Sequence, residues 1–381
     1  MKVLMHCVYY PPEVGGLESH VAELARGMVE VGHEVRVVTS RSIKGLPREE
    51  VVDGVRVYRS WFPSRSPVGW MAHALASIPR TRSWAGWADI VHAQAFASIV
   101  PAGVAARSHG RPLVATFHTS HFLARAPRPM WRSVLSRLVR RPGYALAASR
   151  EIAEVAMALA PGVQVEALTN GVDTERFQPV AADRPPRPGV RQIIVPRRLF
   201  QKNGVEYFVR AMPRIREHVN GVRALVIGDG PERERLEALV EELGVRAEIE
   251  FLGSRPHSEM PGLLSSGELA VFPSLMEATS VAALECMACG LPVVATRVGG
   301  LPEIVDESVG RLVKPADPDD LARGVVELLE SDSLEAKGEA ARARVVEEWS
   351  NARLVERHLE IYRTLLDPAG SDPSVLMGNT E

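Results

Sequence analysis

The sequence has few cysteines and no long apolar run. Its 381 residues include only Cys7, Cys286 and Cys289, too few for a disulfide framework in a chain of this length. Charged residues, proline or glycine interrupt every apolar stretch before it reaches the roughly 20 residues that a membrane-spanning helix needs. The first apolar stretch meets Pro11 and Pro12 too soon for a signal peptide, so we expect a buried strand there. These absences favour a cytoplasmic protein whose contact with a membrane is at most peripheral.

The chain also lacks an excess of positive charge and a complete dinucleotide-binding motif. A formal net charge of -2 at pH 7 excludes a globally basic nucleic-acid-binding protein. The turn containing Gly228 and Gly230 begins like Gly-x-Gly-x-x-Gly, but Arg233 stands where the third glycine would be. This difference argues against a dinucleotide site.

Acidic residues are nearly missing from one long segment. Between Gly54 and Arg150 the only acidic residue is Asp89, whereas the same segment contains fourteen arginines. Residues 130–141 predict a basic amphipathic helix, with Trp131, Val134, Leu135 and Leu138 on one face and Arg132, Arg137, Arg140 and Arg141 among its basic residues. We therefore predict that this segment contacts an anionic membrane surface. The alternative is that its arginines pair with acids of the C-terminal half and that several tryptophans belong to the core.

Strand and helix patterns alternate twice along the chain. Short apolar runs that end in polar residues predict parallel strands, and their carboxyl ends are where open α/β folds bind ligands. A proline-rich stretch at 179–190 separates two such units. The sequence thus predicts two Rossmann-like α/β domains, 1–180 and 181–349, that face each other across a cleft. A helix at 350–366 and a tail at 367–381 follow.

The most informative stretch runs from Pro273 to Thr296. It places Glu277 in a loop after a predicted strand and Glu285 eight residues later, on the next helix. A carboxylate in that loop can accept hydrogen bonds from sugar hydroxyls, and the one on the helix can hold a ribose diol. The N-terminus of the helix offers free N–H groups to a diphosphate. One site could therefore bind a whole sugar nucleotide.

This paired-glutamate stretch resembles the donor-binding signature of glycosyltransferase family 4, a family with the two-domain GT-B fold. Further similar segments extend over nearly the whole chain, at residues 11–16, 32–39, 170–177 and 299–303. Several ordered segments are far more specific than any one motif. One departure is Ala278-Thr279-Ser280, where the family usually has Gly-Phe-Gly after the first glutamate.

The resemblance implies roles for particular residues. Glu277 orients the sugar, Arg197 or the adjacent Arg198 acts with Lys202 on the diphosphate, and His118 lies near the transferred sugar. The donor-binding residues that it implies are Gly15, Gly16, Arg198, Gly228, Gly230, Arg255, Ala278, Thr279, Ser280, Val281 and Glu285. It also implies that no metal or other cofactor is needed, because arginine and lysine neutralise the leaving diphosphate.

The expected function is retaining transfer of a hexose-type sugar from a UDP- or GDP-sugar to a hydroxyl. We expect a lipid or lipid-linked acceptor at the cytoplasmic membrane face, and a small soluble acceptor is the alternative. A GT-B nucleotide-sugar epimerase and a non-catalytic binding protein are further alternatives. His118 and His121, and Cys286 with Cys289, have spacings found in metal sites, but we interpret them as structural or positioning residues because further ligands are missing nearby.

Overall fold

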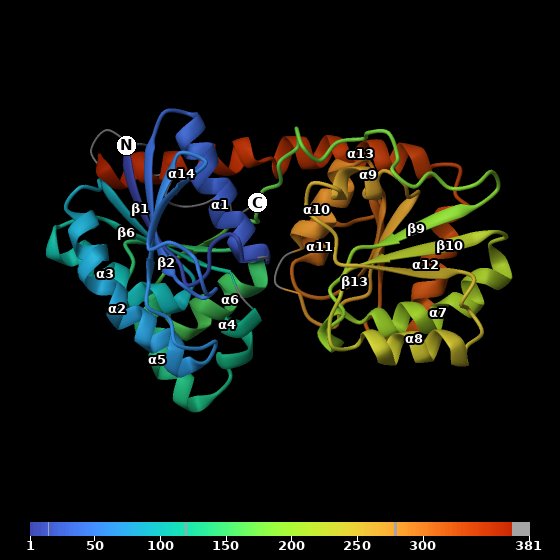
Figure 1. Cartoon of the computed structure of the whole chain (residues 1–381), viewed down its shortest axis with the longest axis horizontal. Helices are drawn as coiled ribbons and strands as arrows, with labels where there is room; N and C mark the ends of the chain where they lie inside the picture. Colours follow the sequence, from blue (N-terminus) through green and yellow to red (C-terminus); the bar gives the residue numbers. More distant parts are fainter. Residues whose placement is uncertain (14, 119, 278–279, 368–381) are drawn as a thin grey trace. The chain divides into compact units, whose positions relative to one another are not determined.

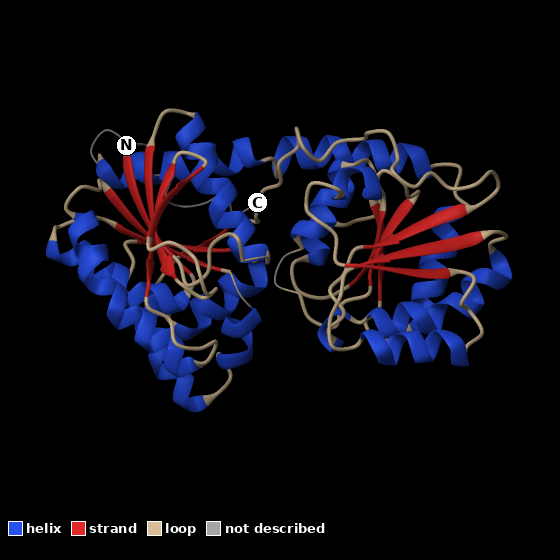
Figure 2. Ribbon diagram, viewed as in Figure 1, coloured by secondary structure: helices blue, strands red, loops and turns tan. Residues whose placement is uncertain are grey.

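The computed structural model describes residues 1–13, 15–118, 120–277 and 280–367. They form two compact units. Unit 1 comprises Met1–Asn170 together with the chain from Asn351 onward, and unit 2 comprises Gly171–Ser350. In each unit, strands form a central sheet with helices on both faces (Figures 1 and 2).

Unit 1 contains an eight-stranded sheet with the order β3-β4-β2-β1-β5-β6-β7-β8. All neighbouring strands are parallel except β3 and β4. The strands are β1 (Lys2–His6), β2 (Glu34–Ser40), β3 (Glu49–Val52), β4 (Val55–Ser60), β5 (Ile90–Gln94), β6 (Leu113–Phe117), β7 (Tyr144–Ala147) and β8 (Val165–Ala167). The helices are α1 (Gly16–Glu30), α2 (Pro67–Ala85), η1 (Phe96–Ser98), α3 (Ile99–Ser108), α4 (Ser120–Arg125), α5 (Pro129–Val139), α6 (Arg150–Leu159) and α14 (Asn351–Leu366).

The last helix, α14, packs on unit 1 beside α1, as Figure 1 shows for the red helix next to the blue one. Its buried Leu354, Val355 and Leu359 join the same hydrophobic cluster as residues of β1 and α1. The apolar stripe of this amphipathic helix thus completes the core of unit 1. Unit 1 is therefore built from two separate parts of the chain.

Unit 2 contains a six-stranded, fully parallel sheet with the order β11-β10-β9-β12-β13-β14. Its strands are β9 (Arg191–Val195), β10 (Val222–Ile227), β11 (Ile249–Gly253), β12 (Leu269–Phe272), β13 (Val293–Thr296) and β14 (Gly310–Val313). Its helices are η2 (Gln201–Asn203), α7 (Val205–His218), α8 (Arg233–Glu242), α9 (Met260–Leu264), α10 (Val281–Ala288), α11 (Leu301–Ile304), α12 (Pro318–Leu329) and α13 (Leu334–Glu348). Two hydrophobic clusters contain buried residues of this sheet and of the helices around it.

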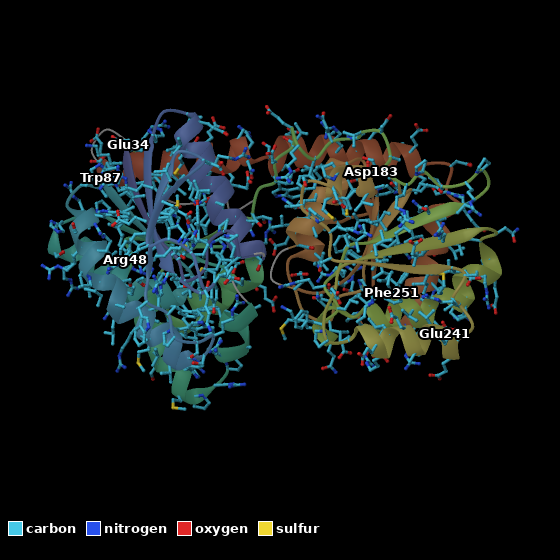
Figure 3. All side chains as sticks on the ribbon, viewed as in Figure 1. Glu34, Arg48, Trp87, Asp183, Glu241 and Phe251 are labelled. Atoms are coloured by element: carbon cyan, nitrogen blue, oxygen red, sulfur yellow. The ribbon has the colours of Figure 1, made fainter. Side chains whose placement is uncertain are left out.

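The proline-rich stretch 179–190 is fastened to unit 2 by hydrogen bonds. The backbone N–H of Val180 donates to Ser265 Oγ, that of Asp183 to the Gly262 carbonyl, and that of Arg184 to Ser266 Oγ. Asp183 lies close to α9 in Figure 3, which draws the side chains of both units. Unit 2 begins at Gly171, before this stretch, and Val172 and Phe177 belong to one of its hydrophobic clusters.

Candidate functional site

An ion pair joins the loops that follow β9 and β12. Arg197 Nη2 lies 2.6 Å from Glu277 Oε2, and both side chains are largely shielded from solvent. The same nitrogen donates to Asn203 Oδ1 at 2.9 Å. Asn203 in turn donates to the Arg198 carbonyl, which fixes the turn between the strand and η2. Neighbouring parallel strands thus bring these charged groups together at the carboxyl edge of the sheet.

Backbone contacts hold the loop before Glu277 in place. The N–H groups of Leu275 and Met276 donate to the Lys202 carbonyl, and Thr296 Oγ1 donates to the Ser274 carbonyl at 2.6 Å. Two glycines at positive φ let other loops approach closely. A Cβ atom on Gly204 would lie 1.9 Å from the Pro273 carbonyl oxygen, and one on Gly299 would lie 1.6 Å from that of Glu277.

Lys202 and Arg198 supply further positive charge near the ion pair of Arg197 with Glu277. Among the described residues, no ion pair engages either side chain, and both side chains reach solvent. Surrounding protein atoms lower the pKa of the Lys202 ammonium, chiefly by displacing water; the Glu277 carboxylate opposes this effect. The Arg198 guanidinium lies 5.7 Å from the centre of the Phe200 ring. Both cations are therefore available to an anionic ligand.

Glu285 lies on α10, whose N-terminus follows Glu277 in the chain. Ser280 caps this helix by accepting a hydrogen bond from the Ala283 N–H, and Arg197 Nη1 lies 3.5 Å from the same Ser280 Oγ. Glu285 is 8% exposed, and its Oε1 lies 2.8 Å from His257 Nε2. The helix therefore begins beside the arginine and carries the second glutamate one turn further on.

Gly228 and Gly230 have a clear packing role. Both have positive φ, and added Cβ atoms would lie 2.3 Å from the Arg197 carbonyl oxygen and 2.4 Å from that of Leu199. The turn that they form therefore supports the backbone that carries Arg197. Arg233, which replaces a third glycine, lies over the ring of Phe251 at 5.4 Å; Phe251 is labelled in Figure 3.

Other expected donor-binding residues have less specific surroundings. Val281 is the first residue of α10, and the exposed Arg255 lies 4.0 Å from Glu259. Ala278 and Thr279 lie outside the described residues. Cys286 and Cys289 are buried, and burial raises the pKa of both thiols, so they remain neutral.

In unit 1, Gly15 and Gly16 form the start of α1, with Gly15 at its N-cap. His118 follows β6 and is buried, with its Nε2 2.6 Å from Gln94 Oε1 and its ring 4.6 Å from that of His20. Burial lowers the pKa of His118 to about 3, so its imidazole is neutral at physiological pH. Because an amide oxygen only accepts, Nε2 carries the hydrogen. The hydrogen bond thus fixes the orientation of the neutral His118 ring.

The expected amphipathic helix is present as α5, but its apolar residues divide between two environments. Leu135 and Leu138 are buried, whereas Val134 is 41% and Met130 82% exposed. The half-buried Trp131 packs against the Arg125 guanidinium, 5.3 Å from its ring centre. Arg132 and Arg137 are exposed on the helix, and the exposed Arg140 and Arg141 follow its end. The buried leucines therefore anchor α5 to unit 1 rather than form part of an exposed apolar face.

No group of three or more metal-ligating side chains occurs within the described part of the chain. The one Asp-x-Asp sequence, Asp317 to Asp319, lies at the start of α12. There Asp317 caps the helix by accepting from the Asp320 N–H, and Asp319 pairs with Arg214. These two carboxylates therefore have structural partners.

Sequence reasoning missed two polar residues of this site. Asn203 carries the hydrogen bonds that join Arg197 to its own turn, and His257 contacts Glu285. Neither residue belongs to a recognisable sequence motif. Each contact joins residues from different structural elements, so the sequence alone does not reveal it. The only sequence signal for His257 was its position shortly after the end of a predicted strand.

Comparisons with known proteins cover most of the chain. Residues 14–176 match the model described as Glycosyltransferase Family 4, and residues 181–344 match that described as Glycosyl transferases group 1. Over 332 residues the chain is 30% identical to a phosphatidylinositol N-acetylglucosaminyltransferase subunit of Arabidopsis thaliana, covering 85% of this chain and 73% of that protein. It is 29% identical over 395 residues to glycogen synthase of Mycobacterium tuberculosis, covering 95% of this chain and 94% of the relative.

Solved structures share the fold. Sucrose-phosphate synthase from Thermosynechococcus elongatus superimposes with a TM-score of 0.83 at 21% identity, covering 97% of this chain and all of that one. Anabaena HepE in complex with UDP-glucose gives a TM-score of 0.74 at 19% identity, with 96% of this chain and all of that one covered. The protein therefore belongs to glycosyltransferase family 4, has the GT-B fold and transfers a sugar from a nucleotide-sugar donor.

Proposed function

We propose that this glycosyltransferase is a retaining hexosyltransferase that uses a UDP- or GDP-sugar and delivers the sugar to a lipid or lipid-linked hydroxyl at an anionic membrane surface. Retention follows from family membership. The observation that carries the choice of acceptor is the exposed apolar and basic surface of unit 1. The donor assignment rests on the charged groups around Arg197 in unit 2.

In the donor site, Glu277 accepts hydrogen bonds from sugar hydroxyls, and Arg197 holds its carboxylate in position. Lys202 and Arg198 face the diphosphate, whose negative charge grows as the bond to the sugar breaks. Glu285 accepts from the ribose hydroxyls. The complex of Anabaena HepE with UDP-glucose supports trying UDP-glucose first as the donor.

The acceptor side rests on side chains of unit 1 that protrude into solvent. On α2, Val68, Met71 and Leu75 are each about 60% exposed or more, at spacings that place them along one side of the helix. Exposed Val100 and Val104 lie on α3, which packs against α2. Met130 and Val134 of α5 are exposed as well, and we refer to these seven exposed residues of unit 1 as the apolar surface. Where such groups adjoin one another, they are typical of an interaction site.

Arginines accompany the apolar surface. Arg125 lies over the rings of Trp70, Phe96 and Trp131, at 5.4, 5.7 and 5.3 Å from their centres, and so links α2, η1 and α5. The exposed arginines of these helices and their ends are Arg82, Arg107, Arg128, Arg132, Arg137, Arg140 and Arg141. Each basic residue near an anionic leaflet contributes about 1 kcal/mol to binding. An anionic bilayer matches both the charge and the apolar groups.

Three other arginines of the segment are paired, but with acids of unit 1 itself, whereas the alternative to membrane contact expected acids of the C-terminal half. Arg59 lies 2.5 Å from Glu50, Arg65 lies 2.6 Å from Glu13, and Arg80 pairs with Glu49. Trp84 is buried. The membrane proposal therefore rests on the seven exposed arginines named above, for which the described residues supply no ion pair, and on the apolar surface. Within the described residues, no helix is long and apolar enough to cross a bilayer.

Sedimentation with liposomes tests the acceptor proposal. We expect the wild type to bind vesicles containing anionic lipid, more weakly as salt rises. Two variants should lose binding: Arg132→Glu with Arg137→Glu, and Val68→Ser with Met71→Ser and Leu75→Ser. A control with Arg187→Glu and Arg246→Glu makes the same charge change on exposed residues of unit 2 and should bind normally. A wild type that ignores anionic vesicles at low salt would favour a soluble acceptor, for which the likeness to glycogen synthase is a precedent.

A further inference from the structure

We propose that His257 is a positioning residue for the nucleoside part of the donor: it aims the Glu285 carboxylate at the ribose diol and so determines how strongly the enzyme requires the 2′-hydroxyl. The inference rests on the proposed donor site, in which Glu285 binds ribose. His257 belongs to no motif of the sequence, and its contact with Glu285 joins the loop after β11 to helix α10.

The geometry gives His257 a defined place. Its Nε2 lies 2.8 Å from Glu285 Oε1, and its ring packs 5.0 Å from that of the buried Phe177 at an angle of 50°. Phe177 is itself held, because its carbonyl accepts from Arg342 Nη1, which also donates to the Ala288 carbonyl at the end of α10. The imidazole is thus supported on one side by a fixed aromatic ring.

The chemistry of the contact fixes the direction of the hydrogen bond. A carboxylate only accepts, so Nε2 of His257 must donate to Oε1 of Glu285. Among the described residues, no protein group donates to the other oxygen, Oε2. Each carboxylate oxygen can accept more than one hydrogen bond. Glu285 therefore keeps acceptor capacity on both oxygens for the two hydroxyls of a ribose, in an orientation that His257 sets.

A role in stability alone explains this contact poorly. The His257 side chain is 45% exposed, and ion pairs or hydrogen bonds at such positions contribute little to folding. Glu285, in contrast, is 8% exposed, so its carboxylate has lost most of its water. A hydrogen bond that orients a nearly buried carboxylate has its main effect on the ligand that uses the remaining lone pairs.

The test compares UDP with 2′-deoxy-UDP, and GDP with 2′-deoxy-GDP, by calorimetry on the intact protein. For wild type we expect the 2′-deoxy form to bind roughly 10- to 100-fold more weakly, the usual range for a lost hydrogen bond to a charged group. His257→Ala should weaken the ribonucleotide about 10-fold and leave the 2′-deoxy form nearly unchanged, so that the discrimination shrinks to a few-fold. His257→Gln should restore part of it, because its amide can donate to Glu285.

His218→Ala is the matched control, since His218 is an exposed histidine of the same unit whose Nδ1 contacts its own helix at the Arg214 carbonyl. It should discriminate like the wild type. Equal weakening of both nucleotides by His257→Ala, or no weakening of either, would overturn the inference while leaving the donor site intact. If the wild type binds none of these nucleotides, the proposed donor site fails and the inference fails with it.

Discussion

Arg197 and Arg198 are neighbours in sequence, but their side chains have different partners. Arg197 is 8% exposed and paired with Glu277, whereas Arg198 is exposed and has no ion pair among the described residues. A guanidinium that holds a carboxylate contributes to the shape of a site, and one facing solvent can meet an incoming anion. The two residues therefore predict different mutant phenotypes.

Replacing Arg197 by alanine should lower both stability and activity, because it leaves the shielded Glu277 carboxylate without its partner. The expected destabilisation is about 2 kcal/mol, less than for a fully buried pair. Arg198→Ala and Lys202→Ala should leave the melting temperature unchanged and reduce turnover, by roughly 100- to 1000-fold for Lys202. Thermal melting and initial rates measured on the same preparations check this. A stable, inactive Arg197→Ala variant would contradict the division of roles.

At the scale of loops and helices, the position of Glu277 depends on a glycine in another loop. Gly299 has φ 54°, and a Cβ there would lie 1.6 Å from the Glu277 carbonyl oxygen. Gly299→Ala must therefore displace the Glu277 loop, and a shift of about 1 Å costs about 100-fold in rate. Gly244→Ala is the control, because Gly244 has a similar φ of 64° with nothing near its Cβ. Enzyme assays should separate the two, and equal activities would refute the clash.

Helix α14 supplies part of the core of unit 1. Its Leu359 is 5% exposed and belongs to the cluster that includes β1 and α1. Leu359→Ala should destabilise unit 1 by about 2–5 kcal/mol, and truncation before Ser350 should do more. Tryptophan fluorescence reports this directly, since five of the six tryptophans lie in unit 1. An unchanged fluorescence melt after truncation would show that unit 1 folds without α14.

The sequence was sufficient for most strands but not for every element. Apolar runs such as those of β6 and β12 are fully buried and easy to recognise, whereas β3 is half-exposed and β8 has three residues. Asp53 and Gly54, both at positive φ, form the turn between β3 and β4, and that Asp-Gly pair was an available hairpin signal. Side-chain pairings such as that of Glu285 with His257 depend on how segments that follow separate strands come together. Such pairings produce no periodic pattern in the sequence.

For the whole molecule, the buried histidines determine how stability depends on pH. Among the side chains that the structure describes, six histidines are buried, and all lie in unit 1: His6, His20, His73, His92, His118 and His358. Burial lowers the pKa of each, to about 4 for His73 and His358 and about 3 for His118. All six are therefore neutral in the folded protein at pH 7.

Below the ordinary histidine pKa of about 6.5, these histidines bind protons in the unfolded chain but not in folded unit 1. The stability of unit 1 should therefore fall as the pH is lowered. A histidine with a folded pKa near 4 costs about 1 kcal/mol by pH 5.5. We expect tryptophan-detected melting to drop steeply between pH 6.5 and 4. The only histidines in the sequence of unit 2 are the exposed His218 and His257. The stabilisation of unit 2 by a bound nucleotide should therefore change less over this pH range. A melt of unit 1 that is flat over this range would contradict buried neutral histidines.

Transfer as a whole should not require a divalent ion. Lys202 and Arg198 provide cationic groups that can neutralise the departing diphosphate, and fixed cations do this without metal. Activity should therefore persist in excess EDTA, within about twofold, in an assay with radiolabelled sugar nucleotide. Complete loss that magnesium or manganese restores would contradict this expectation.

Unit 2 is inserted between the two parts of unit 1, and this has a consequence for synthesis. The ribosome releases residues 171–350 before residues 351–366, so the later-numbered unit has its entire sequence available first. Unit 1, although its chain emerges earliest, must wait for its final helix with an incomplete hydrophobic core. The nascent protein should therefore be most dependent on chaperones in its N-terminal part, and a released chain that ends near residue 350 should contain a folded second unit and an unfinished first one.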